Sequence, residues 1–151
     1  MTTLNIGDKA PEINVLDQDG NPVSLADFKG FKVIIYFYPK DNTPGCTAQA
    51  CNLRDNYDLL LKQGYKILGV SADSQKSHQG FISKFDLPFP LVADVDKKML
   101  MDYGVFGPKK FMGKVYDGIH RTTFVVDENG SIARIIKDVD TKNHTKQILE
   151  G

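Results

Sequence analysis

The segment from Lys32 to Tyr38 places the strongest constraint on how this chain can fold. It is an unbroken run of β-branched and aromatic residues, Val33-Ile34-Ile35-Tyr36-Phe37-Tyr38, with no alternation of apolar and polar positions. Such a run is typical of a strand buried on both faces, in a sheet that other elements cover. It is far shorter than the roughly 18–20 apolar residues that cross a bilayer. We therefore expect an internal strand of an α/β domain.

Helical spacing and further strands follow this segment. From Thr43 to about Lys62, apolar residues recur at three- and four-residue steps, which predicts a helix. Strands are expected at Tyr65–Ser71, Phe89–Val92, Thr122–Val126 and Ser131–Lys137, and helices at Ser74–Phe85, Asp96–Tyr103 and Asp140–Leu149. The alternation favours parallel strands with right-handed crossovers, and the late hairpin adds antiparallel ones. The pattern predicts an α/β fold with a mixed central sheet flanked by helices, which suits a thioredoxin-like fold and other small α/β folds.

Two segments lie outside that alternation. Ile13–Leu16 and Val23–Leu25 flank a turn-rich stretch and predict an N-terminal β-hairpin extension. Gly107–Gly118 is rich in glycine and lysine, and we interpret it as a long, solvated, exposed loop rather than a nucleic-acid patch.

Charge and cysteine content narrow the function. Nineteen basic and nineteen acidic residues give a formal net charge of zero, which argues against a nucleic-acid binder. A length of 151 residues suits one domain, residues 1–151. The first nine residues lack a secretion signal, and no membrane span is predicted, so we expect a cytoplasmic protein. The chain has two cysteines, and in that reducing compartment such a pair favours catalysis or redox activity over structure. His78, His120 and His144 are scattered, without zinc-site spacing.

Cys46 lies at the expected start of a helix. Thr43 is a suitable N-cap and Pro44 suits the first helical position, so Cys46 becomes the third helical residue. Free N–H groups and the helix dipole stabilise negative charge at that position. The sequence therefore predicts that Cys46 is activated as a thiolate nucleophile.

Cys51 lies five residues further along the same helix and is expected on its polar face. Five helical residues place the two Cα atoms about 8–9 Å apart, beyond the ~7 Å limit for a disulfide without backbone movement. If the two sulfurs pair, the helix must unwind locally. We therefore expect three events in order: reaction at Cys46, local unfolding, and disulfide closure by Cys51. A helix that stays protected from hydrogen exchange in the oxidised protein would contradict this order.

The stretch from Pro39 to Cys51 resembles a known family. Pro39-x-x-x-Thr43-x-x-Cys46 is similar to the active-site signature of peroxiredoxins. Thr43-Pro44-Gly45-Cys46-Thr47, with Cys51 and Arg54-Asp55, resembles the bacterioferritin-comigratory or Q-type subfamily. The likeness includes three further segments: Gly7–Pro11, Gly69–Asp73 and Gly118–Asp127.

This resemblance implies a thioredoxin fold and a thiol peroxidase that needs no cofactor. Cys46 matches the peroxidatic cysteine, which becomes a sulfenic acid. Cys51 matches the resolving cysteine, which forms an intramolecular disulfide that thioredoxin reduces. Thr43 and Arg121 match the residues that hydrogen-bond the thiolate and the peroxide, and Pro39 matches the proline that shields the sulfur. The implied substrates are hydrogen peroxide and alkyl hydroperoxides. Because the resolving cysteine is in the same chain, we expect a monomer.

Two further positions, one near Cys46 and one beside Arg121, bear on the proposed active site. Gln49 stands where the subfamily commonly has glutamate, and a neutral amide hydrogen-bonds without adding charge. We expect activity to be retained. His120 should point to the face opposite Arg121 if the strand is regular, and we interpret it as structural.

Three other functions remain open from the residues alone. A copper carrier of thioredoxin fold would bind copper(I) through both thiols, although such carriers space their cysteines more closely. A disulfide oxidoreductase favours Cys-x-x-Cys, which the chain lacks. A non-enzymatic redox sensor could have the same site, and only sustained turnover with a reductant separates it from an enzyme.

Overall fold

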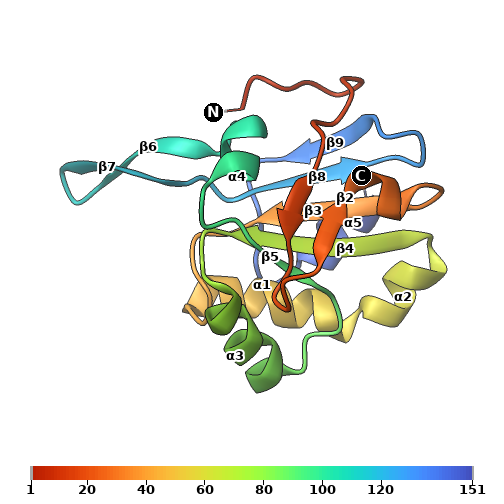
Figure 1. Ribbon diagram of the computed structural model, residues 1–151, viewed down its shortest axis with the longest axis horizontal. Coiled ribbons are helices and arrows are strands. Elements are labelled where there is room, and N and C mark those ends of the chain that lie inside the picture. The colour runs from red at the N-terminus through yellow and green to blue at the C-terminus, as the bar shows by residue number, and fades with distance from the viewer. Residues whose placement is uncertain (1, 151) are drawn as a thin grey trace.

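Strand β3 (Lys32–Phe37) is the centre of a mixed sheet. In the computed structural model, which describes residues 2–150, this sheet has the order β5-β4-β3-β8-β9. The other strands are β4 (Tyr65–Ser71), β5 (Leu91–Ala93), β8 (Thr122–Val126) and β9 (Ile132–Ile136). β3, β4 and β5 are parallel, whereas β8 and β9 are antiparallel to their neighbours. The predicted mixed α/β sheet is therefore confirmed (Figure 1).

Alternation along β3 divides the interior into two cores. Val33, Ile35 and Phe37 belong to one buried cluster, and Ile34 and Tyr36 belong to the other. This is the double burial that the unbroken apolar run predicts, because successive side chains of a strand point to opposite faces.

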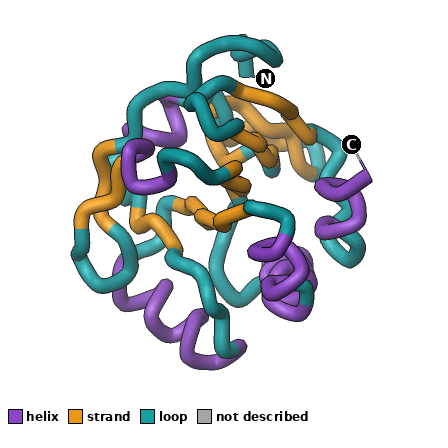
Figure 2. The backbone as a smooth tube through the Cα atoms, turned by 90° about the vertical axis from the view of Figure 1, so that its right-hand side faces the viewer, coloured by secondary structure: helices purple, strands orange, loops and turns teal. Residues whose placement is uncertain are grey.

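Each core is covered by its own set of elements. The cluster that contains Ile34 and Tyr36 is covered by four helices, α1 (Pro44–Asp55), α2 (Tyr57–Lys62), α3 (Gln75–Phe85) and α5 (His144–Glu150). The opposite cluster is covered by the N-terminal hairpin and two short helices, β1 (Asn14–Leu16), β2 (Pro22–Ser24), η1 (Leu25–Phe28) and α4 (Lys98–Asp102). Figure 2 shows the strands between these outer elements. The N-terminal hairpin extension is confirmed.

The predicted helix over residues 43–62 is interrupted at Asn56, so it forms α1 and α2. The Asn56 side-chain amide donates to the carbonyl of Asn52 at 2.8 Å, which is the carbonyl a helical N–H of residue 56 would use. The backbone N–H of Asn56 turns to Arg54 instead. The asparagine side chain thus competes with the backbone N–H for this carbonyl, as asparagine side chains commonly do.

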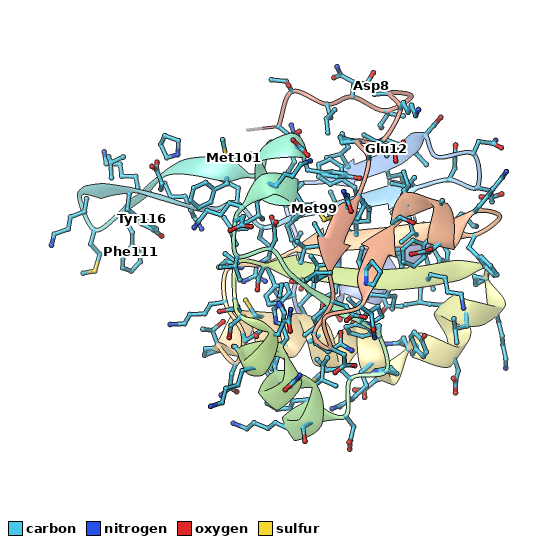
Figure 3. All side chains as sticks on the ribbon, in the orientation of Figure 1. Asp8, Glu12, Met99, Met101, Phe111 and Tyr116 are labelled. Carbon is cyan, nitrogen blue, oxygen red and sulfur yellow. The ribbon has the colours of Figure 1, made fainter. Side chains whose placement is uncertain are left out.

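The segment Gly107–Gly118 is not a loop, and that prediction is wrong. It forms a hairpin of β6 (Phe106–Phe111) and β7 (Lys114–Ile119), with a two-residue turn at Met112 and Gly113. Both turn residues have positive φ, 50° and 80°, as a tight type I′ turn requires. Most of the hairpin is exposed, so its sequence lacks the alternation of apolar and polar residues that predicts a strand. Its glycines and proline are also uncommon in strands. Phe111 and Tyr116 project from it away from the sheet (Figure 3).

The other predicted elements are confirmed, with ends shifted by a few residues. Among the described residues, no helix combines the length and apolar character that a membrane crossing needs.

Candidate active site

The start of α1 presents Cys46 as the sequence predicts. Thr43 occupies the N-cap position with extended backbone, and Pro44 is the first helical residue. The Thr43 hydroxyl, however, donates to the carbonyl of Lys40 at 2.8 Å and makes no capping bond to the helix. The side-chain capping by Thr43 that its position suggests is therefore wrong. The unpaired N–H groups of the first turn remain available to stabilise negative charge.

The Cys46 thiol is buried, with 1% of the residue exposed, and packs in the apolar cluster beneath the helices. Arg121 lies immediately before β8, and its Nη2 donates to Cys46 Sγ at 3.3 Å. A guanidinium carries a permanent positive charge and stabilises negative charge that develops on an atom beside it. Residues 75 positions apart in the chain therefore form one polar contact in an apolar setting.

Gln49 holds the same guanidinium from the next turn of α1. Its Oε1 accepts a hydrogen bond from Arg121 Nη1 at 2.7 Å, and the side chain is fully buried. Arg121 is thus fixed between Cys46 and Gln49 in two directions. Because Gln49 is neutral, it orients the arginine without competing with a thiolate for its charge.

Gly45 makes the approach of Arg121 possible. A Cβ atom at this position would lie 3.3 Å from Arg121 Nη2, closer than an ordinary van der Waals contact. Sequence reasoning assigned Gly45 no role of its own. The available signal was a glycine in the first turn of a helix, where its flexibility costs stability.

The loop between β3 and α1 is anchored by Asp41. Its carboxylate accepts hydrogen bonds from Tyr38 Oη at 2.6 Å, Ser77 Oγ at 2.8 Å and His78 Nδ1 at 2.7 Å. The backbone N–H of Asp41 donates to Asp73 at 2.9 Å. These bonds fasten the loop that carries Pro39 and Thr43 to helix α3 and to the end of β4.

His78 is the buried centre of this anchor, with no exposed surface. Its Nε2 donates to the carbonyl of Val92 at 2.8 Å, so the ring has an acceptor on each side. Asp41, Asp73 and His78 also bring possible ligand atoms within 4.8 Å of one another, a spacing that a metal could use. The hydrogen bonds among these residues and to Ser71 explain why they lie so close together, because the cluster anchors the loop. A lone histidine in the sequence gave no sign of it.

The remaining predicted site residues lie close along the chain. Cys51 is on α1, partly exposed, and both thiols are free while the helix runs unbroken through them. Pro39 is half-buried in the loop before α1. His120 does not oppose Arg121 across a regular strand, because residues 120 and 121 lie between β7 and β8 and both line one cavity. Its Nε2 donates to the carbonyl of Pro108 at 2.9 Å.

The chain belongs to the AhpC/TSA family, whose match covers residues 6–135. It is 48% identical to peroxiredoxin Bcp of Escherichia coli over 149 residues, which cover 99% of this chain and 96% of that protein. Among solved structures, a cysteine-to-serine variant of Xylella fastidiosa PrxQ superposes with a TM-score of 0.92, at 28% identity, 99% coverage of this chain and 96% of that one.

A second similar structure belongs to a relative whose chemical activity is stated. It is the Xanthomonas campestris bacterioferritin comigratory protein, described for its alkyl peroxide reduction activity, with a TM-score of 0.86 and 32% identity. The match covers 99% of this chain and 96% of that one. The thioredoxin-like fold of peroxiredoxins is therefore confirmed for this chain.

Proposed function

We propose that this protein is a peroxiredoxin that reduces hydrogen peroxide and organic hydroperoxides to water and alcohols. One observation supports this above the others: Arg121 donates to the sulfur of Cys46 at 3.3 Å, at the N-terminus of a helix and out of contact with water. Membership of the AhpC/TSA family and the names of its relatives support the same activity.

In the first step, the Cys46 thiolate attacks one oxygen of the peroxide. The O–O bond breaks, a sulfenic acid forms, and the other oxygen leaves as water or an alcohol after it takes up a proton. Negative charge moves from the sulfur to the leaving oxygen during this displacement. A guanidinium fixed beside the sulfur stabilises that charge without reorganisation, and Gln49 fixes the guanidinium. We assign Thr43 a hydrogen bond to the peroxide and Pro39 the shielding of the sulfur.

In the second step, the Cys51 thiol attacks the Cys46 sulfenic acid, a disulfide forms and water leaves. Within an intact α1 the two Cα atoms are about 8–9 Å apart by helix geometry, which is too far for a disulfide. We infer that α1 unwinds locally before closure. A nearby second thiol also prevents further, irreversible oxidation of the sulfenic acid.

A dithiol reductant, thioredoxin or a similar protein, returns the disulfide to two thiols. Because both cysteines belong to one chain, the reaction needs no second subunit, and we propose a monomer formed by one domain, residues 1–151. We propose the cytoplasm as its compartment, where such reductants operate.

The test combines thiol counting and intact mass after reduced protein is mixed with one equivalent of hydrogen peroxide. The wild type should lose both thiols rapidly. Cys46→Ser should abolish the reaction, and Cys51→Ser should stop at a sulfenic acid, 16 Da heavier by the mass of one oxygen, trapped as an adduct with dimedone. Sustained turnover with thioredoxin distinguishes an enzyme from a redox sensor. Slow oxidation that is insensitive to Cys46→Ser would contradict the proposal.

A further inference from the structure

Arg121 borders a second space as well as the thiol. A cavity of about 280 Å³ lies at the base of the β6–β7 hairpin, beside the N-terminal segment. Its walls are formed by six residues, Thr2, Lys109, His120, Arg121, Thr122 and Lys137. Three of these side chains carry a permanent positive charge, and none is a carboxylate. The cavity is therefore a cationic pocket that shares its arginine with the reactive sulfur.

Lys109 is held in place in this pocket. Its Nζ donates to the carbonyl of Ile119 at 2.8 Å. Its methylene stem crosses Gly118, where a Cβ atom would lie only 3.0 Å from Lys109 Cδ. An ammonium has three N–H donors, so this bond leaves two for a ligand. A lysine ordered in this way loses less side-chain entropy on binding than a freely rotating one.

Within the part of the chain that the structure describes, the positive side chains of the pocket form no ion pair. Over residues 2–150, neither Lys109, Arg121 nor Lys137 lies within 4 Å of a carboxylate, although Lys98 and Lys146 form such pairs elsewhere. The whole chain has equal numbers of basic and acidic residues, so the local excess arises from their placement. Like charges that gather without a partner repel one another, and an anion between them removes that cost.

We propose that this cationic pocket binds a small oxyanion, a carboxylate or a phosphate, beside the peroxide site. The inference rests on the proposed function and deepens it. Arg121 contacts Cys46 through its guanidinium and is also one of the residues that line the pocket, so an anionic group in the pocket and a peroxide at the sulfur would both lie beside this one residue. At about 280 Å³ the pocket is smaller than most ligand sites, and it fits an acidic head group rather than a whole substrate.

Two sources can supply that oxyanion, and they make different predictions. It can be the carboxylate of an organic hydroperoxide whose acid group lies a few bonds from the O–O bond, in which case the pocket selects substrates. It can instead be free phosphate, which would occupy Arg121 and compete with peroxide.

The first arm of the test measures the rate of Cys46 oxidation by a short alkyl hydroperoxide that carries a carboxylate, relative to its methyl ester. The wild type should prefer the acid. Lys109→Met and Lys137→Met should each lower the acid-to-ester ratio by roughly three- to tenfold, the effect of one charge-assisted contact. Lys110→Met is the matched control, because Lys110 neighbours Lys109 on β6 but is exposed and does not line the pocket. It should keep the wild-type ratio.

The second arm titrates the wild type with inorganic phosphate, following the His120 imidazole resonances by NMR and the inhibition of hydrogen peroxide reduction. Binding that Lys109→Met and Lys137→Met weaken, with competitive inhibition, identifies free phosphate as a ligand. An acid preference without phosphate binding identifies the substrate carboxylate. An acid-to-ester ratio near one together with no phosphate binding would overturn the inference. The proposed function would survive that result, because it depends on hydrogen peroxide reduction by the wild type.

Discussion

The two halves of helix α1 carry one cysteine each and are anchored to different parts of the molecule. In the first half, the buried Cys46 thiol and the buried Gln49 side chain hold it to Arg121, just before β8. In the second half, Cys51 is partly exposed, and Asn52 holds the helix to the segment that begins α5. The Asn52 amide donates to the carbonyl of Lys142 at 2.9 Å and accepts from the N–H of Thr145 at 2.8 Å.

This difference shows how one helix can serve two steps with opposite requirements. Attack on peroxide needs a sulfur fixed beside a guanidinium, and disulfide closure needs one of the two cysteines to move. Because the halves have separate anchors, the Cys51 half can leave α5 while the Cys46 half keeps its contacts. We therefore expect substitutions at the two anchors to affect different steps.

The largest effect should come from breaking the Cys46 anchor. Arg121→Met keeps much of the side-chain volume but removes the donor to the sulfur and the charge. By analogy with the loss of one oxyanion donor, we expect the rate of Cys46 oxidation by peroxide to fall about 10²–10³-fold. The measurement is rapid-quench alkylation followed by intact mass.

Arg134→Met is the control for loss of an arginine, because Arg134 donates to carbonyls of α5 and does not contact Cys46. If Arg121→Met and Arg134→Met slow oxidation equally, the guanidinium beside the sulfur does not stabilise the transition state.

The next effect concerns the loop that leads into the Cys46 half. His78→Ala removes the 2.7 Å hydrogen bond to the buried Asp41 carboxylate and the 2.8 Å bond to the Val92 carbonyl, and each buried polar group left without such a partner typically costs about 1–3 kcal/mol. We expect a loss of about 3 kcal/mol in the free energy of unfolding by urea. Lys76→Ala, an exposed position on the same helix α3, should change it little. A loss below about 0.5 kcal/mol would mean that the pair does not anchor the loop.

A smaller and opposite effect is expected at the Cys51 anchor. Asn52→Ala removes two hydrogen bonds, one to Thr145 of α5 and one to Lys142 just before it, and should lower the free energy of unfolding by about 1–2 kcal/mol. Because unwinding then costs less, conversion of the sulfenic acid to the disulfide should accelerate several-fold, while the first oxidation rate stays within twofold. The conversion is followed by rapid-quench mass spectrometry, with the exposed Gln63→Ala as control. Unchanged closure would place the unwinding at the Cys46 end.

The smallest effect is a pH dependence on the α5 side. Burial is the main cause that lowers the pKa of His144 below its ordinary value of 6.5, and Arg121 and Arg134 add to it. The folded protein therefore keeps this ring neutral while the unfolded chain binds a proton. Since the unfolded state then holds more protons, stability should decrease as the pH falls from 7.5 to 5.5.

The measurement is urea unfolding of the wild type and His144→Asn across that range. The variant lacks the titrating ring that accepts from Thr123, so its stability should depend less steeply on pH. Equal slopes would show that His144 does not contribute to the dependence.

The elements nearest to Cys46 were predictable because their signals are local. The burial of β3 follows from its own apolar run, and the start of α1 follows from Thr43 and Pro44. In both cases adjacent residues are enough to determine the structure. The hydroxyl of Thr43 is the local exception, since it bonds to Lys40 rather than to the helix. The role of Arg121 was predicted only through its resemblance to a family motif.

The sequence by itself therefore determined the class of sheet, the position of the cysteine that we propose as the nucleophile, and the residues of its motif. Tertiary structure alone decided the pairing of Asp41 with His78, 37 residues away, and the contact of Gln49 with Arg121, 72 residues away. It also decided the β6–β7 hairpin and the cationic pocket at its base. Periodicity reports burial within one element, whereas these contacts depend on which elements meet. The chain must fold before a lone histidine or a run of lysines acquires a partner.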